Sequence, residues 1–219
     1  MRTIAASGIA LALTACSAFA DGLPAPPPGY EPAVYSWSGF YFGVNGGYGW
    51  ASATGNYGHD SGSGAIAGGQ IGFNWQTGKL VLGMEIDSQW SGQKTKDLVC
   101  AFMCGTTLTD SVDYFGTGRI RLGAAFDRAL VYATGGAAWT HVSTTMGAGI
   151  GTANGGGFGW TVGSGAELAM TNNVSLTLEY LFIDTPGVTL LLPGGVPSSS
   201  FEVRDSIARV GLNVRFPAN

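Results

Sequence analysis

The motif His141-Val142-Ser143 has the residue types of a hydrolytic site. Residues two apart on an extended strand project from the same face, so the imidazole and the hydroxyl are expected to be neighbours. A nucleophile and a base of this kind also need a third group that orients the base. No acid follows in the adjoining sequence, and Glu167 is expected on the other face of its strand. We therefore predict no catalytic residue, and we interpret His141, like His59, as an ordinary residue of a strand end or loop.

Cys100 and Cys104 occur together as Cys-Ala-Phe-Met-Cys in a predicted loop. In an exported protein, which meets an oxidising compartment, this pair favours a disulfide that pins the loop tip. Two thiols without clustered histidines make a poor metal site. The glycine-rich stretches lack the following helix and lysine of a phosphate-binding loop. We predict neither a metal nor a cofactor.

Nine charged residues form the remaining candidate set. Each lies in a segment that alternates apolar with polar residues, and each occupies the polar phase of its segment. All nine are therefore expected on the face opposite to the apolar side chains. The set contains the acids Glu85, Asp87, Asp113, Glu167 and Glu179 and the bases Arg119, Arg121, Arg209 and Arg215.

The C-terminal segment, residues 206–216, shows the alternation that must position these charges. From Ala208 onward its apolar residues are all even-numbered and its polar or small residues are all odd-numbered, a period of two that predicts a β-strand. Roughly ten residues is the length that a tilted strand needs to cross a bilayer. The apolar face carries Ala208, Val210, Leu212, Val214 and Phe216.

Seven further segments alternate in the same way. The connections between successive segments are alternately long and short. The phase of residues 129–142 is ambiguous, and we favour Val131 and Trp139 on the apolar face. The short connections are tight turns near residues 77–79, 127–128 and 171–173. The predicted strands cover residues 38–50, 65–76, 80–91, 111–126, 129–142, 156–170, 174–184 and 206–216.

Composition favours a membrane β-barrel. The chain has 219 residues, of which only 11% are charged, and it contains 37 glycines. After the N-terminus no run of about 18 apolar residues occurs, so no transmembrane helix is expected. The net charge of −4 provides no basic patch of the kind that nucleic acid requires. We predict an all-β fold, an eight-stranded antiparallel transmembrane β-barrel of the outer-membrane type.

The distribution of aromatic residues supports this prediction. With both chain ends in the periplasm, the short turns are periplasmic and the long loops external. The aromatic side chains then gather near both membrane interfaces, as expected for two girdles. The periplasmic group contains Trp75, Phe126 and Phe216, near Trp37, and the external group contains Trp50, Trp90, Tyr114, Trp139, Trp160 and Phe182.

The N-terminus has the features of an export signal. Residues 1–20 contain Arg2, an apolar stretch and a small-x-small cleavage site that ends at Ala20. Cys16 offers an alternative, because residues 13–16 match the lipobox of bacterial lipoproteins. We favour cleavage after Ala20, since a barrel supplies its own membrane anchor. Residues 21–36 are predicted to form a proline-rich periplasmic leader, and residues 37–219 the barrel.

Several segments resemble known outer-membrane proteins. Residues 37–50, 68–75 and 82–87 resemble the first three strands of the alphaproteobacterial surface-antigen family, which is related to the opacity-type, porin-family eight-stranded barrels. That resemblance implies envelope-integrity and surface-interaction roles and no catalytic residues. The His-x-Ser spacing at position 141 resembles that of outer-membrane lipid A deacylases. The last strand resembles the insertion signal of outer-membrane proteins, here carried by Arg209, Gly211, Val214 and Phe216.

These observations lead to a functional prediction. An eight-stranded barrel is only wide enough for side chains to fill it, and buried charges must be paired. Two readings of these charges are possible: a salt-bridge network that closes the lumen, and a narrow path for ions. We favour the closed lumen. We expect an outer-membrane protein with a structural and surface role; the alternatives are a small diffusion pore and a lipid-modifying hydrolase. The expected partners are outer-membrane lipid and lipopolysaccharide, the barrel-assembly machinery, and a host or surface ligand of the external loops.

Overall fold

The computed structural model describes residues 35–55, 58–98, 107–146, 151–192, 196–197 and 201–217. The chain divides into two units, Met1–Ala33 and Val34–Asn219, and the described residues all belong to the second. In this part of the chain no helix is long and apolar enough to cross a membrane. The predicted signal peptide, the leader up to residue 34 and all three cysteines lie outside the described residues.

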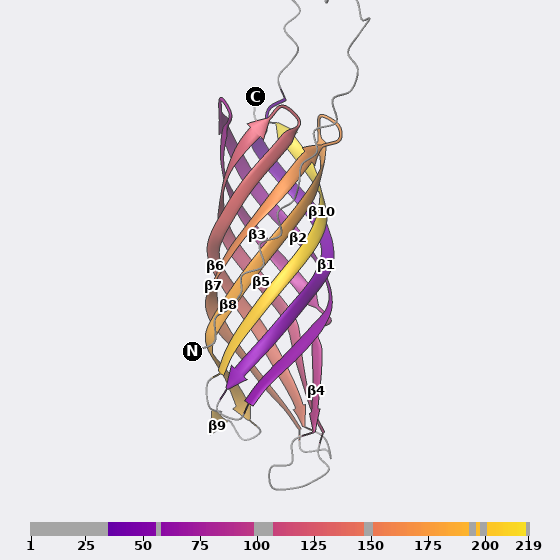
Figure 1. Cartoon of the computed structure of the whole chain (residues 1–219), viewed down its shortest axis with the longest axis vertical. Coiled ribbons are helices and arrows are strands. Elements are labelled where there is room, and N and C mark those ends of the chain that lie inside the picture. The colour runs from indigo at the N-terminus through magenta and orange to yellow at the C-terminus, as the bar shows by residue number, and fades with distance from the viewer. Residues whose placement is uncertain are drawn as a thin grey trace, which may run out of the picture. The chain divides into compact units, whose positions relative to one another are not determined.

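The described residues form long strands that alternate in direction along the chain (Figure 1). The long strands are β1 (Gly39–Gly55), β2 (Gly58–Thr77), β3 (Leu80–Ser91), β5 (Thr107–Phe126), β6 (Ala129–Met146), β7 (Gly151–Ala169), β8 (Val174–Leu192) and β10 (Phe201–Pro217). Two short strands accompany them, β4 (Lys94–Leu98) and β9 (Val196–Pro197).

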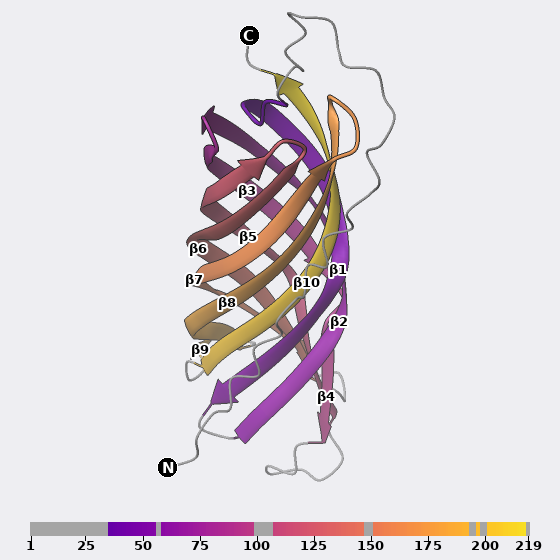
Figure 2. The ribbon, with the colours of Figure 1, turned by 45° about the horizontal axis from the view of Figure 1, so that its top comes forward.

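The long strands close into a barrel. Their order around it is β1-β10-β8-β7-β6-β5-β3-β2, every pairing is antiparallel, and β2 pairs with β1 to complete the ring. Closure leaves no unpaired sheet edge to face lipid. The predicted eight-stranded antiparallel barrel is therefore confirmed, and Figure 2 shows the tilt of its strands from a second direction.

The two ends of the barrel differ, and we name them the turn end and the loop end. At the turn end, tight turns join β2 to β3, β5 to β6 and β7 to β8, as predicted. Gly78 and Asp127 adopt positive φ angles of 59° and 51° in two of these turns, a conformation that Gly and Asp tolerate well. The loop end is opposite and carries β4 and β9 (Figure 1).

At the loop end the strands extend beyond their predicted ranges, which is a correction to the sequence analysis. β1 continues to Gly55 and β2 begins at Gly58, so the predicted long loop up to residue 62 is mostly strand. β8 continues to Leu192, although the prediction ended at residue 184. Beyond the membrane neither strand face needs to contact lipid, so the apolar alternation is lost there. Period-two analysis therefore detects the membrane-spanning parts and misses their extensions.

The apolar phase of each strand points outward. Val44, Met84 and Ile120 are between 60% and 65% exposed on the isolated barrel, as expected for side chains that face lipid. In β6, whose phase the sequence left ambiguous, Val131 is 52% exposed. Trp139 shares this phase and covers Gly116 of the neighbouring strand, where an added Cβ would meet the indole at 2.1 Å. The favoured outward phase of β6 is confirmed.

Candidate functional site

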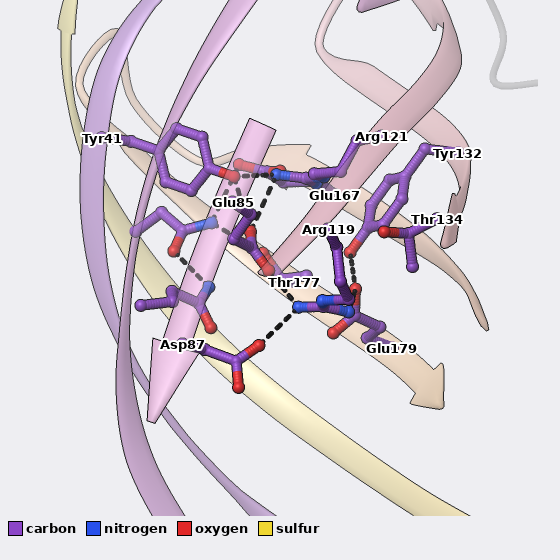
Figure 3. A network of polar contacts seen from close by, with 12 residues as sticks. Tyr41, Glu85, Asp87, Arg119, Arg121, Tyr132, Thr134, Glu167, Thr177 and Glu179 are labelled. Carbon is purple, nitrogen blue, oxygen red and sulfur yellow. Dashed lines mark hydrogen bonds and ion pairs between the residues drawn. The ribbon is translucent and has the colours of Figure 1, made fainter. Parts of the chain in front are cut away.

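Eight of the nine predicted inward charges meet inside the barrel in one network, and Figure 3 shows the part of it around Glu85, Arg119 and Arg121. Each of them is at most 3% exposed. The ninth, Asp113, lies at an irregularity in the pairing of β5 with β6, between Val112 and Tyr114, and its side chain is outside the described residues. The eight are Glu85 and Asp87 of β3, Arg119 and Arg121 of β5, Glu167 of β7, Glu179 of β8, and Arg209 and Arg215 of β10.

One half of the network surrounds Arg119 and Arg209. Arg119 donates to Asp87 at 2.8 Å and to Glu179 at 3.0 Å, and it also pairs with Glu85. Arg209 contacts Glu179 at 2.5 Å and Asp87 at 3.2 Å. Each guanidinium therefore bridges several carboxylates, which satisfies more of its fixed donor positions than a single pair does.

The other half surrounds Arg121 and Arg215, which share one carboxylate. Arg121 Nη2 lies 2.8 Å from Glu167 Oε2, and Arg215 Nη2 lies 3.0 Å from Glu167 Oε1. Arg121 also reaches Glu85 at 3.3 Å and so joins the two halves. The described network contains four carboxylates and four guanidiniums, and its formal charge is zero.

Two tyrosines complete this network, and the sequence analysis did not assign them to it. Tyr41 donates its hydroxyl to Glu85 at 2.5 Å and accepts from Arg121 at 2.6 Å. Tyr132 donates to Glu179 at 3.0 Å, and its ring lies 3.8 Å from the Arg121 guanidinium carbon. The signal for Tyr41 was its odd position in β1, opposite in phase to the outward aromatics of that strand.

A chain of amide side chains lines the wall made by β1, β2 and β10. Asn45 donates to Gln70 at 2.7 Å, Gln70 donates to Asn213 at 2.7 Å, and Asn213 donates to Glu167 at 3.2 Å. All three amide residues are less than 10% exposed. The amides therefore extend the charged network across the lumen, so polar side chains fill its middle.

Inward glycines make room for these long side chains. A Cβ added to Gly43 would meet Asn213 at 2.0 Å, and one added to Gly72 would meet the ring of Tyr41 at 2.4 Å. At such distances something must shift, because side chains of neighbouring strands already occupy the space. The high glycine content thus follows in part from a narrow lumen packed with large polar groups.

An apolar cluster, which we call the turn-end seal, covers the network at the turn end. It consists of Tyr35, Trp37, Val81, Ala125, Leu130, Tyr132 and Ala169. Trp37 was expected near the periplasmic girdle, but it is 0% exposed and lies inside the barrel. Its place at the turn end is as expected, but its inward direction was not predicted, because a tryptophan just before a strand looks the same in sequence whether it faces lipid or folds inward.

Four contacts hold Trp37 in the turn-end seal. Its indole Nε1 donates to the Asp127 carbonyl at 3.1 Å, and its backbone nitrogen donates to Gln76 at 2.6 Å. Arg215 donates to its carbonyl oxygen, and the Arg215 guanidinium carbon lies 4.5 Å from the ring centre. The segment before β1 is therefore tied both to a turn and to the strand that closes the barrel.

A second apolar cluster, the loop-end seal, covers the network from the opposite side. It consists of Ile66, Phe115, Ala138, Leu181, Ile183 and Ile207, all at most 3% exposed. Toward the loop end it is followed by Thr140 and Thr185, whose hydroxyls lie 3.2 Å apart, and by buried Asp205. The lumen therefore has three layers, with a polar middle between two apolar seals.

The predicted insertion signal lies in the closing strand. Arg209 and Gly211 face the lumen, whereas Phe216 is 54% exposed on the outer face and stacks on Phe42 with ring centres 5.6 Å apart. Val214 is half-buried and pairs with Phe42 of β1. These residues are thus placed at the seam between the first and last strands, where the barrel closes.

The motif at His141 lies on the outer face of the barrel. Its imidazole stacks on Tyr114 with ring centres 4.7 Å apart and an interplanar angle of 9°. Glu167, the acid considered as a possible orienting group, is 1% exposed inside the lumen and pairs with Arg121 and Arg215. The structure does not bring them together. The side chains of His59, Cys100 and Cys104 lie outside the described residues. The predicted disulfide therefore stays a prediction.

Residues 8–216 match the family described as the outer membrane protein beta-barrel domain. The chain is 34% identical to the 31 kDa outer-membrane immunogenic protein of Brucella melitensis, over 99% of this chain and 100% of that one. It is 30% identical to the 22 kDa outer membrane protein of Rhizobium leguminosarum, over 83% of this chain and 79% of that one.

Solved structures share the fold. The outer membrane protein OprG of Pseudomonas aeruginosa covers 84% of this chain at a TM-score of 0.52 and 11% identity, with all of that chain matched. Neisserial surface protein A covers 82% of this chain, and 98% of its own, at a TM-score of 0.50 and 17% identity.

These features define an outer-membrane β-barrel with alphaproteobacterial relatives. The chain belongs to the outer membrane protein beta-barrel domain family, and its location is the outer membrane.

Proposed function

We propose that this protein is a closed barrel that anchors surface loops in the outer membrane and supports the envelope without conducting solutes. The observation that carries this proposal is the three-layered lumen, in which a neutral network lies between two apolar seals. Eight paired charges stabilise each other only if water and ions do not replace their partners. A filled lumen of this kind favours a structural role over the alternative of a small pore.

The absence of catalysis belongs to the same proposal. The support is positional, because His141 stacks on Tyr114 outside the barrel wall while Glu167 is paired inside it. The relatives are named as outer-membrane immunogenic proteins, which is consistent with a surface role rather than an enzymatic one. In the described part of the chain, the residues considered for lipid hydrolysis therefore do not form a catalytic site.

The proposed partners follow from the two faces of the barrel. The outer face contacts outer-membrane lipid and lipopolysaccharide. The closing strand, which contains Phe216, is recognised by the barrel-assembly machinery. The loop end faces the cell exterior, where a host or surface ligand would be bound. The support for this orientation is that the three tight turns lie together at one end, whereas at the other end the strands extend beyond their predicted membrane-spanning ranges.

Surface labelling of intact cells tests the orientation and the surface role together. We expect epitope tags inserted at Gly105, in the segment between β4 and β5, and at Gly195, in the segment between β8 and β9, to be accessible to antibody. Tags at Gly78 and Asn172, in the turns, should become accessible only after the outer membrane is permeabilised. Labelling of the turn sites on intact cells would contradict the proposal.

Deletion of the gene in its native host tests the structural role. A strain that lacks the protein should admit large antibiotics and detergents more readily, and wild-type protein should restore the barrier. The His141→Ala variant serves as a control, since a structural role predicts full restoration by it. Failure of this variant to restore the barrier, with normal assembly, would point to the hydrolase instead.

A further inference from the structure

One buried carboxylate in the lumen, that of Asp205, takes no part in the network. The residue is 6% exposed and faces the inside of the barrel. The next residue, Ser206, pairs with Trp50 and Phe182, both assigned to the girdle that faces the headgroups. The membrane-spanning part of β10 is therefore residues 206–216, and Asp205 lies just beyond it on the loop-end side.

Asp205 differs from the network carboxylates in its partner. Gln93 Nε2 donates to both of its carboxylate oxygens, at 2.9 Å and 3.0 Å. Among the described residues it has no arginine or lysine partner, whereas each network carboxylate contacts at least two arginines. An amide satisfies hydrogen bonds but supplies no positive charge, so burial of the ionised form is left uncompensated.

The described side chains around Asp205 carry no charge that corrects this imbalance. It lines a cavity in which the other side chains are apolar or hydroxyl-bearing: Phe115 of β5, Thr140 of β6, Ile183 and Thr185 of β8, and Val203 of β10. On the β1 side lies Gly49, where an added Cβ would meet Gln93 at 2.1 Å and Asp205 at 3.3 Å. A carboxyl group in this cavity is accommodated best when it is neutral.

The nearest described charges already have their own partners. Arg209 lies two inward positions deeper on the same strand and is held by Glu179 and Asp87. Arg204 lies on the outer face, where it contacts Glu202 at 2.5 Å and Asp184 at 3.6 Å. Neither guanidinium is placed to neutralise the carboxylate of Asp205.

We propose that Asp205 is a proton-operated switch next to the loop-end seal. In its protonated form the carboxyl is neutral, keeps an acceptor for Gln93 and closes the loop end as an uncharged layer. In its ionised form it places one negative charge among apolar side chains and draws water into the cavity. The switch makes the stability of the loop end depend on external pH. The paired network alone would not produce this dependence.

The direction of titration agrees with this geometry. Burial raises the pKa of the Asp205 carboxyl to about 6, against smaller opposing effects of the hydrogen bonds from Gln93 and the Ser206 backbone. The folded value lies above that of the unfolded chain, so ionisation weakens the fold. The loss is complete above about pH 6 and disappears as the pH falls toward about 4, the ordinary range of aspartate.

Equilibrium unfolding in urea of the full-length protein, refolded in lipid vesicles, tests the switch through the Asp205→Asn variant. At pH 7.5 this variant should have an unfolding equilibrium constant roughly a hundredfold lower than that of the wild type, since each pKa unit corresponds to a factor of ten. The difference should vanish near pH 4. Asp184→Asn is the matched control, because this acid lies on the outer face of β8, and it should keep the wild-type pH dependence.

Amide hydrogen exchange shows whether the effect is local to the seal. At pH 7.5 the amides of Val203 and Thr185 should exchange several-fold faster in the wild type than in Asp205→Asn, and equally fast near pH 4. The amide of Arg209 should show a much smaller ratio. Equal or lower stability of Asp205→Asn at pH 7.5 would overturn the switch, because it would mean that the ionised carboxylate is compensated. That result would leave the closed-lumen proposal unaffected.

Discussion

The two ends of the lumen solve the same problem with different chemistry. At the turn end, Arg215 is buried beside Trp37, and its charge is matched by Glu167 at 3.0 Å. At the loop end, Asp205 is buried among apolar side chains, and its partner is the amide of Gln93. The turn end therefore contains a balanced ion pair, whereas the loop end contains an acid whose charge state depends on pH.

This difference indicates that the turn end stays closed over the pH range in which Asp205 titrates, whereas the stability of the loop end changes with pH. The turn-end seal joins the segment before β1, a turn and the closing strand through hydrogen bonds to one tryptophan. The loop-end seal is held by apolar contact, with the hydroxyl pair of Thr140 and Thr185 next to it, and the described side chains of this region form no ion pair inside the lumen. We therefore expect substitutions at the turn end to cost more stability than matched substitutions at the loop end.

The largest effect is expected from Trp37→Ala at the turn end. Loss of a buried tryptophan costs about 3–5 kcal/mol, and here the cavity also leaves network groups open to water. Phe115→Ala is the matched variant of the loop-end seal, with an expected cost toward the lower end of the same range. Urea unfolding in lipid vesicles measures both. A larger loss for Phe115→Ala than for Trp37→Ala would reverse the comparison.

Arg215→Ala should come next, with a loss of about 3 kcal/mol. The substitution removes a counter-charge from Glu167, which keeps Arg121 and the hydroxyl of Ser175, and it removes the donor to the Trp37 carbonyl. Arg204→Ala is the control, because its ion pairs are more exposed and such pairs contribute about 0–1 kcal/mol. Equal losses for the two arginines in the same unfolding assay would show that the buried pair has no special weight.

Much of this arrangement could be predicted from alternation alone. Glu85, Glu179 and Arg209 each follow an apolar neighbour in a period of two, and a closed barrel forces that polar phase inward. Tyr41 and Tyr132 were missed because an aromatic residue gives no sign of its face once two girdles are expected. Their inward phase was visible only relative to the outward apolar residues of the same strands.

Other features could not be predicted because they depend on the shape of the closed barrel. Trp37 precedes the first strand, so no alternation constrains its direction, and only closure creates the opening that it fills. Asp205 lies beyond the apolar repeat of β10, in the part of the strand that does not face lipid. Asp205 has no arginine partner because its neighbours in space come from β5, β6 and β8. These strands are distant from Asp205 in the sequence, so the sequence alone does not identify the neighbours.

Phe216→Ala separates assembly from stability at the turn end. Phe216 faces outward next to inward Arg215, so its loss removes the stacking on Phe42 and a contact with lipid but breaks no ion pair. We expect a several-fold decrease in heat-modifiable, folded protein in the outer membrane, with only a modest change in the stability of the barrels that do assemble. Quantitative gel-shift analysis of membrane fractions measures the first effect. Wild-type yield of the variant would show that the insertion signal has been misplaced.

The smallest effect is expected from Thr140→Val at the loop end. The substitution keeps the shape of the side chain and removes its hydroxyl, which lies 3.2 Å from that of Thr185. Loss of one neutral hydrogen bond costs about 1 kcal/mol. If the cost in urea unfolding instead exceeds that of Arg215→Ala, the loop end is not the weaker seal.

The central claim is that the lumen is closed from end to end, and single-channel recording tests it most directly. Refolded wild-type protein in a planar bilayer at neutral pH should give the same current as the empty bilayer over a range of voltages. An open porin in the same apparatus provides the positive control. The account predicts no discrete conductance steps from wild-type protein that is shown to be folded and inserted. Reproducible, long-lived steps from that protein would contradict it, because ions would then cross a lumen in which paired charges and two apolar seals leave them no path.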